Sequence, residues 1–128
     1  MTTPRLRPLA RVLALIAASA LCACFAAAPA TAATPRSKSC DVSAVADRLG
    51  PTSVSAVKVI GTSCPNGIAV VKAFHACRLT NGTSGRCVRR VKGFACMEQR
   101  TGSTPQFTAL VTCKKDRATV SHRYTQVV

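Results

Sequence analysis

Apolar side chains recur every three or four residues in Ile68–Cys77, at Val70, Val71, Phe74 and Cys77. This spacing predicts an amphipathic helix of about three turns, with Lys72 on its polar side. Pro65 is compatible with the first turn of such a helix, and Asn81-Gly82 ends the turn that follows it. We therefore expect one main helix here.

Elsewhere the apolar period is two, which is typical of strands that bury one face. The pattern predicts an antiparallel hairpin from 106–113 and 117–124, joined by the polar turn Lys114–Arg117. Ser53–Ile60 predicts a strand before the helix, and Arg86–Glu98 predicts one or two strands that are broken or bent at Gly93. The expected order is β-α-β-β-β.

This order predicts an α+β fold in which one main helix packs on a small antiparallel sheet, because the helix has one apolar stripe and each strand one apolar face. We expect this domain to span residues 53–128. Residues 34–52 form an N-terminal segment in this interpretation, with a short helix expected at Val42–Leu49.

Residues 1–33 carry the features of an export signal. Residues 1–11 hold three arginines and no acid, and residues 12–28 are apolar apart from Ser19. Small residues follow, which predicts release near Ala32 or Ala33 and a secreted product. No second apolar segment of membrane-spanning length follows, so we expect no transmembrane segment after residue 33.

A second interpretation of this region stays open. Leu21-Cys22-Ala23-Cys24 resembles a bacterial lipobox, in which the last cysteine receives a lipid. Lipidation at Cys24 would anchor the same domain to a membrane as a lipoprotein.

Residues 34–128 contain six cysteines: Cys40, Cys64, Cys77, Cys87, Cys96 and Cys113. An even number in an exported chain of this size predicts a disulfide framework. Their long spacings disfavour a metal or redox site, and we expect no cofactor. Cys77 and Cys87 flank the glycine-rich loop Thr80–Gly85 and are the expected pair. The helix separates Cys64 from Cys77 too widely for a bridge, and the remaining pairings stay open.

Several short motifs resemble those of small exported actinobacterial proteins. They are Thr62-Ser63-Cys64 at the helix start, Cys87 with Val91-Lys92-Gly93-Phe94-Ala95-Cys96, Val111-Thr112-Cys113 and the last strand, Val120–Tyr124. The resemblance covers about residues 54–124, and Cys77 is an addition to its pattern. It implies an exported αβ domain with cysteine bridges and implies no particular activity.

Residues 34–128 carry 15 Lys and Arg against four Asp and Glu, a formal net charge of +11. Two basic groups stand out, and together they form a candidate patch for anionic ligands: Arg86, Arg89, Arg90, Lys92, Lys114, Lys115 and Arg117. Such a patch suits anionic polymers or lipid headgroups at the cell surface. Because few aromatic side chains are available for stacking, we expect no sequence-specific nucleic-acid binding.

Few residues are suited to catalysis, so we expect no enzymatic activity and name no catalytic residue. The enzymatic alternative is a small secreted ribonuclease that uses His75 and His122 as acid and base. Another alternative is an inhibitor of an exported enzyme or toxin, which would present the loop Thr80–Gly85 to a protein partner.

Overall fold

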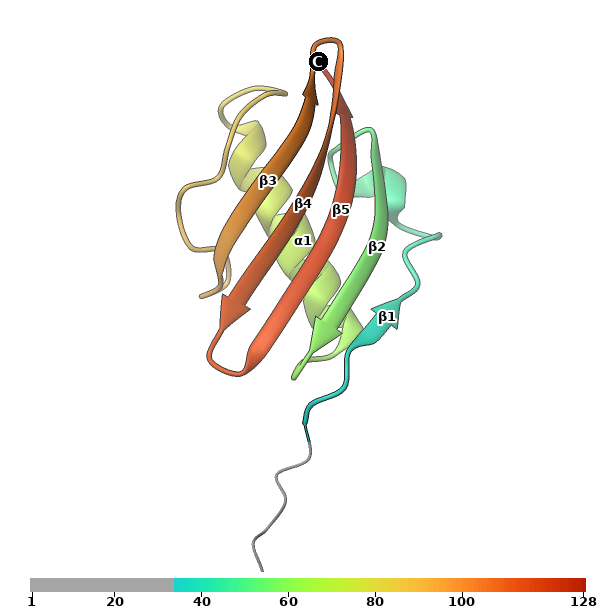
Figure 1. Cartoon of the computed structure of the whole chain (residues 1–128), viewed down its shortest axis with the longest axis vertical. Coiled ribbons are helices and arrows are strands. Elements are labelled where there is room, and N and C mark those ends of the chain that lie inside the picture. The colour runs from blue at the N-terminus through green and yellow to red at the C-terminus, as the bar shows by residue number, and fades with distance from the viewer. Residues whose placement is uncertain (1–33) are drawn as a thin grey trace, which may run out of the picture. The chain divides into compact units, whose positions relative to one another are not determined.

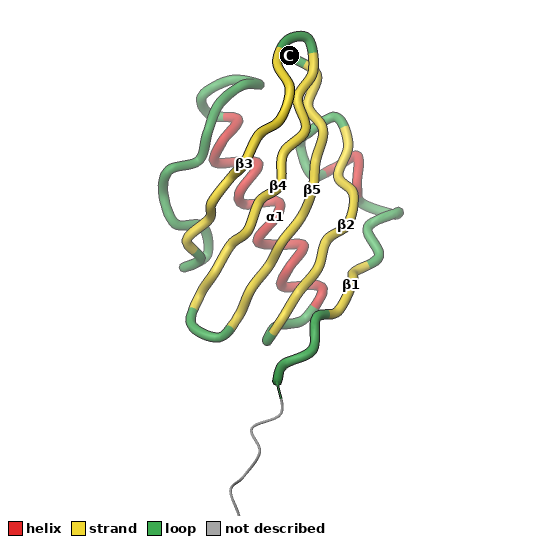
Figure 2. The backbone as a smooth tube through the Cα atoms, viewed as in Figure 1, coloured by secondary structure: helices red, strands yellow, loops and turns green. Residues whose placement is uncertain are grey.

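The structure is a computed structural model that describes residues 34–128. The expected signal peptide, its release near Ala32 or Ala33 and the alternative lipidation at Cys24 lie outside the described residues. Five antiparallel strands form one sheet in the order β1-β2-β5-β4-β3, and the long helix α1 crosses one face of it (Figures 1 and 2). The expected α+β fold is confirmed.

The strands and helices follow the chain in a simple order. They are β1 (Lys38–Cys40), the 3-10 turn η1 (Ala46–Arg48), β2 (Ser53–Ile60), α1 (Cys64–Leu79), β3 (Ala95–Ser103), β4 (Gln106–Lys115) and β5 (Ala118–Val127). The predicted strand 53–60 and the predicted hairpin are present, and the hairpin strands run slightly farther than expected. β1 belongs to the same sheet, so residues before position 53 contribute to the domain.

The predicted break at Gly93 is present, but the strand predicted before it is not. Arg86–Arg90 forms no strand, and Val91 and Phe94 make only an isolated bridge around Lys92-Gly93. The regular strand β3 begins at Ala95. Lys92 and Gly93 both adopt positive φ values, 49° and 81°, which close a tight turn and prevent a continuous strand across this point.

Helix α1 begins at Cys64, so Pro65 lies in its first turn as predicted. Ser63 caps it, because its side-chain oxygen accepts a hydrogen bond from the Asn66 backbone N–H at 3.4 Å. Val70, Val71, Phe74 and Cys77 are buried, as the period predicts. Gly67 lets the helix approach the sheet closely, since a Cβ at this position would collide with the Val59 side chain.

The sheet has two unlike faces. The inner face packs against α1 and buries the alternate positions of β4 and β5, among them Val111, Cys113, Val120 and Tyr124. The outer face carries the intervening residues, such as Leu110 and Arg123. In Figure 1 the strands stand in front of α1, and no described element covers this outer face.

In the middle of strand β2, the alternation of buried and exposed residues is interrupted. Val54 and Val57 are both buried although they are three positions apart, because a bulge lies between Ser55 and Lys58. Ser55 and Ala56 are both exposed, and Ala56 has a φ of +56°. The spacing in SVSAVKVI therefore reflects a bulge rather than a regular alternation.

Three disulfides link the described cysteines: Cys40–Cys64, Cys77–Cys87 and Cys96–Cys113. The expected Cys77–Cys87 pair is confirmed. The first bridge ties β1 to the start of α1, the second ties the end of α1 to the following loop, and the third joins directly paired residues of β3 and β4. Such a framework is typical of proteins in an oxidising or extracellular environment.

Candidate functional site

The two basic groups of the sequence meet at one end of the sheet. The loop before β3 supplies Arg89, Arg90 and Lys92, the end of β4 supplies Lys115, and the β4–β5 turn supplies Arg117. The Lys115 side chain lies so close to Gly93 that a Cβ there would be 3.3 Å from its Nζ. We call these five cations the basic end.

The remaining two residues of the candidate patch behave differently. Lys114 is on the outer face of β4, one position before Lys115. Arg86 makes an ion pair with Glu98, with 3.5 Å between Nη1 and Oε2. The patch is therefore centred on the basic end, with Lys114 at its border and Arg86 partly neutralised.

The loop from 80 to 87 is held in place by hydrogen bonds to its backbone carbonyls. Arg78 Nη1 donates to the Thr83 carbonyl at 2.7 Å, and Arg100 donates to the carbonyls of Ser84 and Gly85. The Cys77–Cys87 bridge closes the same loop. The basic residues that follow are thus attached to an ordered support.

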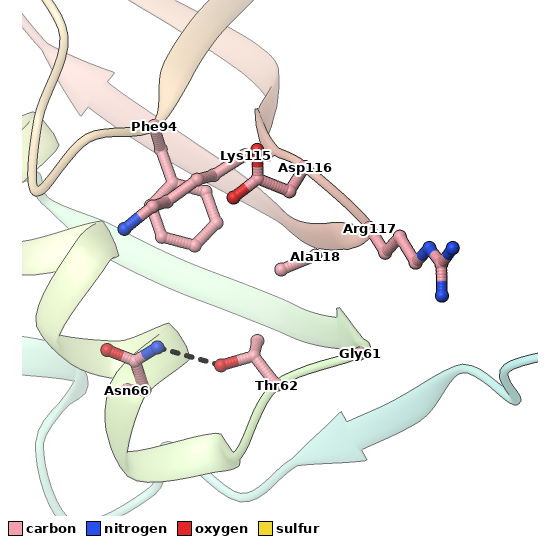
Figure 3. Close-up of a pocket in the computed structure, with 8 residues that line it drawn as sticks. All are labelled: Gly61, Thr62, Asn66, Phe94, Lys115, Asp116, Arg117 and Ala118. Carbon is pink, nitrogen blue, oxygen red and sulfur yellow. Dashed lines mark hydrogen bonds between the residues drawn. The ribbon is translucent and has the colours of Figure 1, made fainter.

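A shallow depression lies beside the basic end (Figure 3). Phe94, Lys115 and Asp116 line one side of it, and Thr62 and Asn66 near the start of α1 line the other, where Asn66 Nδ2 donates to Thr62 Oγ1 at 2.7 Å. Figure 3 shows Arg117 extending away from the other lining side chains. The depression is open to solvent.

The two histidines of the ribonuclease hypothesis are also brought together, but inside the protein. His75 from α1 and His122 from β5 have 2.9 Å between their Nε2 atoms. Their exposed fractions are 0% and 1%. General acid–base catalysis requires contact between such groups and the substrate, so this burial gives no support to a ribonuclease site.

A directed hydrogen-bond chain fixes the tautomers of these rings. Arg78 Nε–H donates to His75 Nδ1 at 2.9 Å, so the proton of a neutral His75 is on Nε2. That Nε2–H donates to His122 Nε2, which leaves the His122 proton on Nδ1. This Nδ1 is buried and has no hydrogen-bond partner among the described residues.

Burial keeps both rings neutral. Burial, followed by the influence of His122 and of Arg78, lowers the pKa of His75 to about 2. Burial and the Arg78 guanidinium lower the pKa of His122 to about 4. A charged imidazole here would lose its water shell beside a permanent cation. The pair is therefore a neutral structural element near pH 7.

Further polar groups complete what we call the inner polar cluster: His75, Arg78, Glu98, Arg100, His122, Tyr124 and Gln126. The Arg78 guanidinium donates to the Gln126 side chain, and its Cζ lies 4.7 Å from the Tyr124 ring centroid. The Tyr124 hydroxyl donates to Glu98, and Arg100 Nε donates to Glu98 Oε1 at 3.0 Å. Burial is the main reason that the pKa of Tyr124 is raised, and the Glu98 hydrogen bond adds to it.

Sequence reasoning misses most of this cluster. One signal is present, since Val71, Phe74, His75 and Arg78 share one helix face by their spacing of three and four. A lone arginine on a helix is usually exposed, so the pattern assigns Arg78 no role. Its burial depends on Gln126 and Tyr124, which are distant in sequence.

The described residues contain no group of three or more His, Cys, Asp or Glu suited to a metal ion. Within residues 34–128, no helix has the length and apolar character needed to cross a membrane. Comparisons with known proteins found no matching family model, no matching curated protein and no matching solved structure.

Proposed function

We propose that this protein is an exported, non-enzymatic binding module that holds anionic surfaces or polymers through its basic end. One observation carries the proposal: the packing of Lys115 against Gly93 joins two basic segments that lie about twenty residues apart in the sequence. Five cations then share one end, and Asp116 is the acidic side chain between two of them, Lys115 and Arg117. Clustered charges of one sign raise the local concentration of a polyanion.

Retention on immobilised dextran sulfate tests this proposal. The variant Arg89→Glu, Arg90→Glu, Lys115→Glu replaces three cations of the basic end with anions, which weakens its attraction to the sulfate groups. Because salt screens exposed charges within about 10 Å at 0.1 M, the weaker attraction should be overcome at clearly lower salt than for the unchanged protein. The matched control Arg36→Glu, Arg48→Glu, Lys72→Glu makes the same change in net charge outside the basic end. Equal elution of the two triple variants would show that net charge alone causes retention and would refute the proposal.

A second candidate is an inhibitor of an exported enzyme or toxin that presents Thr80–Gly85. The observation in its favour is the fixation of that loop by Arg78, Arg100 and the Cys77–Cys87 bridge. A loop that is ordered before binding loses less conformational entropy in a complex. Capture from culture fluid separates the candidates: one stoichiometric protein partner, no longer captured when Asn81-Gly82 is replaced by Ala-Ala, favours the inhibitor.

A further inference from the structure

The outer face of the sheet is a second cationic surface, separate from the basic end. Lys58 on β2, Lys114 on β4 and Arg123 on β5 are exposed on this face. Serine and threonine side chains occupy much of the rest, and no described acidic side chain lies among them. The face therefore carries positive charge without a local counter-charge.

The bulge in β2 shapes a depression on this face. Its lining residues are Ser55, Ala56, Lys58, Leu110, Ser121 and Arg123. The extra residue of the bulge turns both Ser55 and Ala56 outward. Ala56 stays in the left-handed region at φ +56°, which costs an L-residue about 1 kcal/mol or more. Bulges with strained residues often occur next to binding sites.

The depression combines two cations with two hydroxyl groups. Lys58 pairs with Ser121, and Arg123 is two residues farther along β5, so their Cα atoms are about 8 Å apart. Arginine offers a planar set of N–H donors that matches a phosphate, and lysine adds a mobile point charge. The Ser55 and Ser121 hydroxyls border the same space.

We propose that this depression binds phosphate groups of a linear, base-free polyphosphate-type polymer that also contacts the basic end. The proposal rests on the proposed function, because it assigns a ligand class and a second contact to the same binding module. Lys114 lies between the two regions, about 12 Å from Lys58 by strand spacing and register. Cations thus continue from the β4–β5 turn across the sheet.

The chemistry of the face favours a polymer without bases. Proteins that hold single-stranded nucleic acids usually stack bases on exposed aromatic side chains. The aromatic residues of the described chain, Phe74, Phe94, Phe107 and Tyr124, are all buried. Charge and hydroxyl donors remain as the means of recognition, and these suit repeated phosphate groups.

The test measures the affinity for long-chain inorganic polyphosphate over a range of salt concentrations. The slope of log K against log salt is negative for such binding. Each substitution that removes a phosphate-binding cation should reduce its magnitude by about 1, so Lys58→Ser, Arg123→Ser should reduce it by about 2. The matched control Arg48→Ser, Lys72→Ser removes two exposed cations elsewhere and should leave the slope nearly unchanged. All four side chains are exposed, so both variants should fold.

The outcomes separate the two proposals. If the unchanged protein is retained on dextran sulfate but does not bind polyphosphate, the polyphosphate-type ligand is refuted and the proposed function stands. If the charge reversal at the basic end weakens binding to neither polymer, the proposed function fails. If the basic-end variant no longer binds while Lys58→Ser, Arg123→Ser matches its control, only the outer-face site is refuted. Tighter binding of single-stranded oligothymidylate than of polyphosphate, with the same dependence on Lys58 and Arg123, would overturn the base-free ligand.

Discussion

Along β5, His122, Tyr124 and Gln126 point to the inner face, whereas Ser121 and Arg123 point to the outer face. The inner residues are buried and join side chains of α1 and β3 through hydrogen bonds. The outer residues line a depression that faces solvent. One strand thus carries polar side chains with two different roles, and its period of two separates them.

The inner and outer polar residues differ in how much each contributes to the stability of the fold. A buried polar group that loses its partner is costly, because water cannot replace that partner. An exposed cation can change with little effect on stability. We therefore expect substitutions on the inner face to affect folding and those on the outer face to affect binding.

The largest effect is expected from Arg78→Met. Arg78 is fully buried and donates to His75, Thr83 and Gln126, so its removal leaves three acceptors without this donor. Breaking a buried charged network should lower the free energy of unfolding by about 3–5 kcal/mol. Urea titration measures this, with the exposed Lys72→Met on the same helix as a control. A decrease below about 1 kcal/mol would contradict a structural role for the cluster.

The second-largest effect is expected from acidification, which should lower the free energy of unfolding. His75 and His122 have folded pKa values of about 2 and 4, below the value of 6.5 for the free side chain. Their contribution to stability is therefore complete above pH 6.5 and is lost as pH falls from there through the folded values. Between pH 7 and pH 5 the loss should approach about 2 kcal/mol for each histidine.

The charged and titratable groups around His75 and His122 come from three elements. Arg78 faces it from α1, Tyr124 lies beside it on β5, and Glu98 and Arg100 of β3 bind the Tyr124 side of the cluster. Urea titrations at pH 7 and pH 5 measure the stability change. Ring carbon shifts measured by NMR should show both imidazoles still neutral at pH 5 in the folded protein, and titration of either near pH 6.5 would contradict the assignment.

The smallest effect concerns the outer face. Ala56→Gly should raise the free energy of unfolding by about 0.5 kcal/mol, because relief of the left-handed conformation slightly exceeds the added freedom of glycine in the unfolded chain. At Ala76, exposed in α1, the same exchange should instead cost about 1 kcal/mol. Destabilisation at both positions would argue against strain at the bulge.

Much of the fold is predictable because local patterns are strong. The period of three and four around Phe74 and the period of two in the hairpin each describe one buried face, and both elements form as expected. The predicted break at Gly93 is present as a tight turn at Lys92-Gly93, whereas the strand predicted at 86–90 is absent. The spacing of Val54 and Val57 contains the bulge, but spacing alone does not identify it as one.

The candidate site is only partly predictable. The basic residues are visible in the sequence, and the packing of Lys115 against Gly93 brings most of them to one end. The sequence does not tell that Arg86 pairs with Glu98 or that Lys114 turns to the outer face. Nor does it separate Lys58 and Arg123 from ordinary surface charges, because they meet only across paired strands.

By itself, the sequence determined the α+β class, the positions of the main helix and hairpin, the Cys77–Cys87 pair and the excess of positive charge. These depend on local periodicity, short spacing and composition. Only the tertiary structure decided that His75 and His122 meet in a dry interior, and that separate basic segments share one end. Contacts between residues distant in the chain depend on strand order and register, which local patterns do not specify.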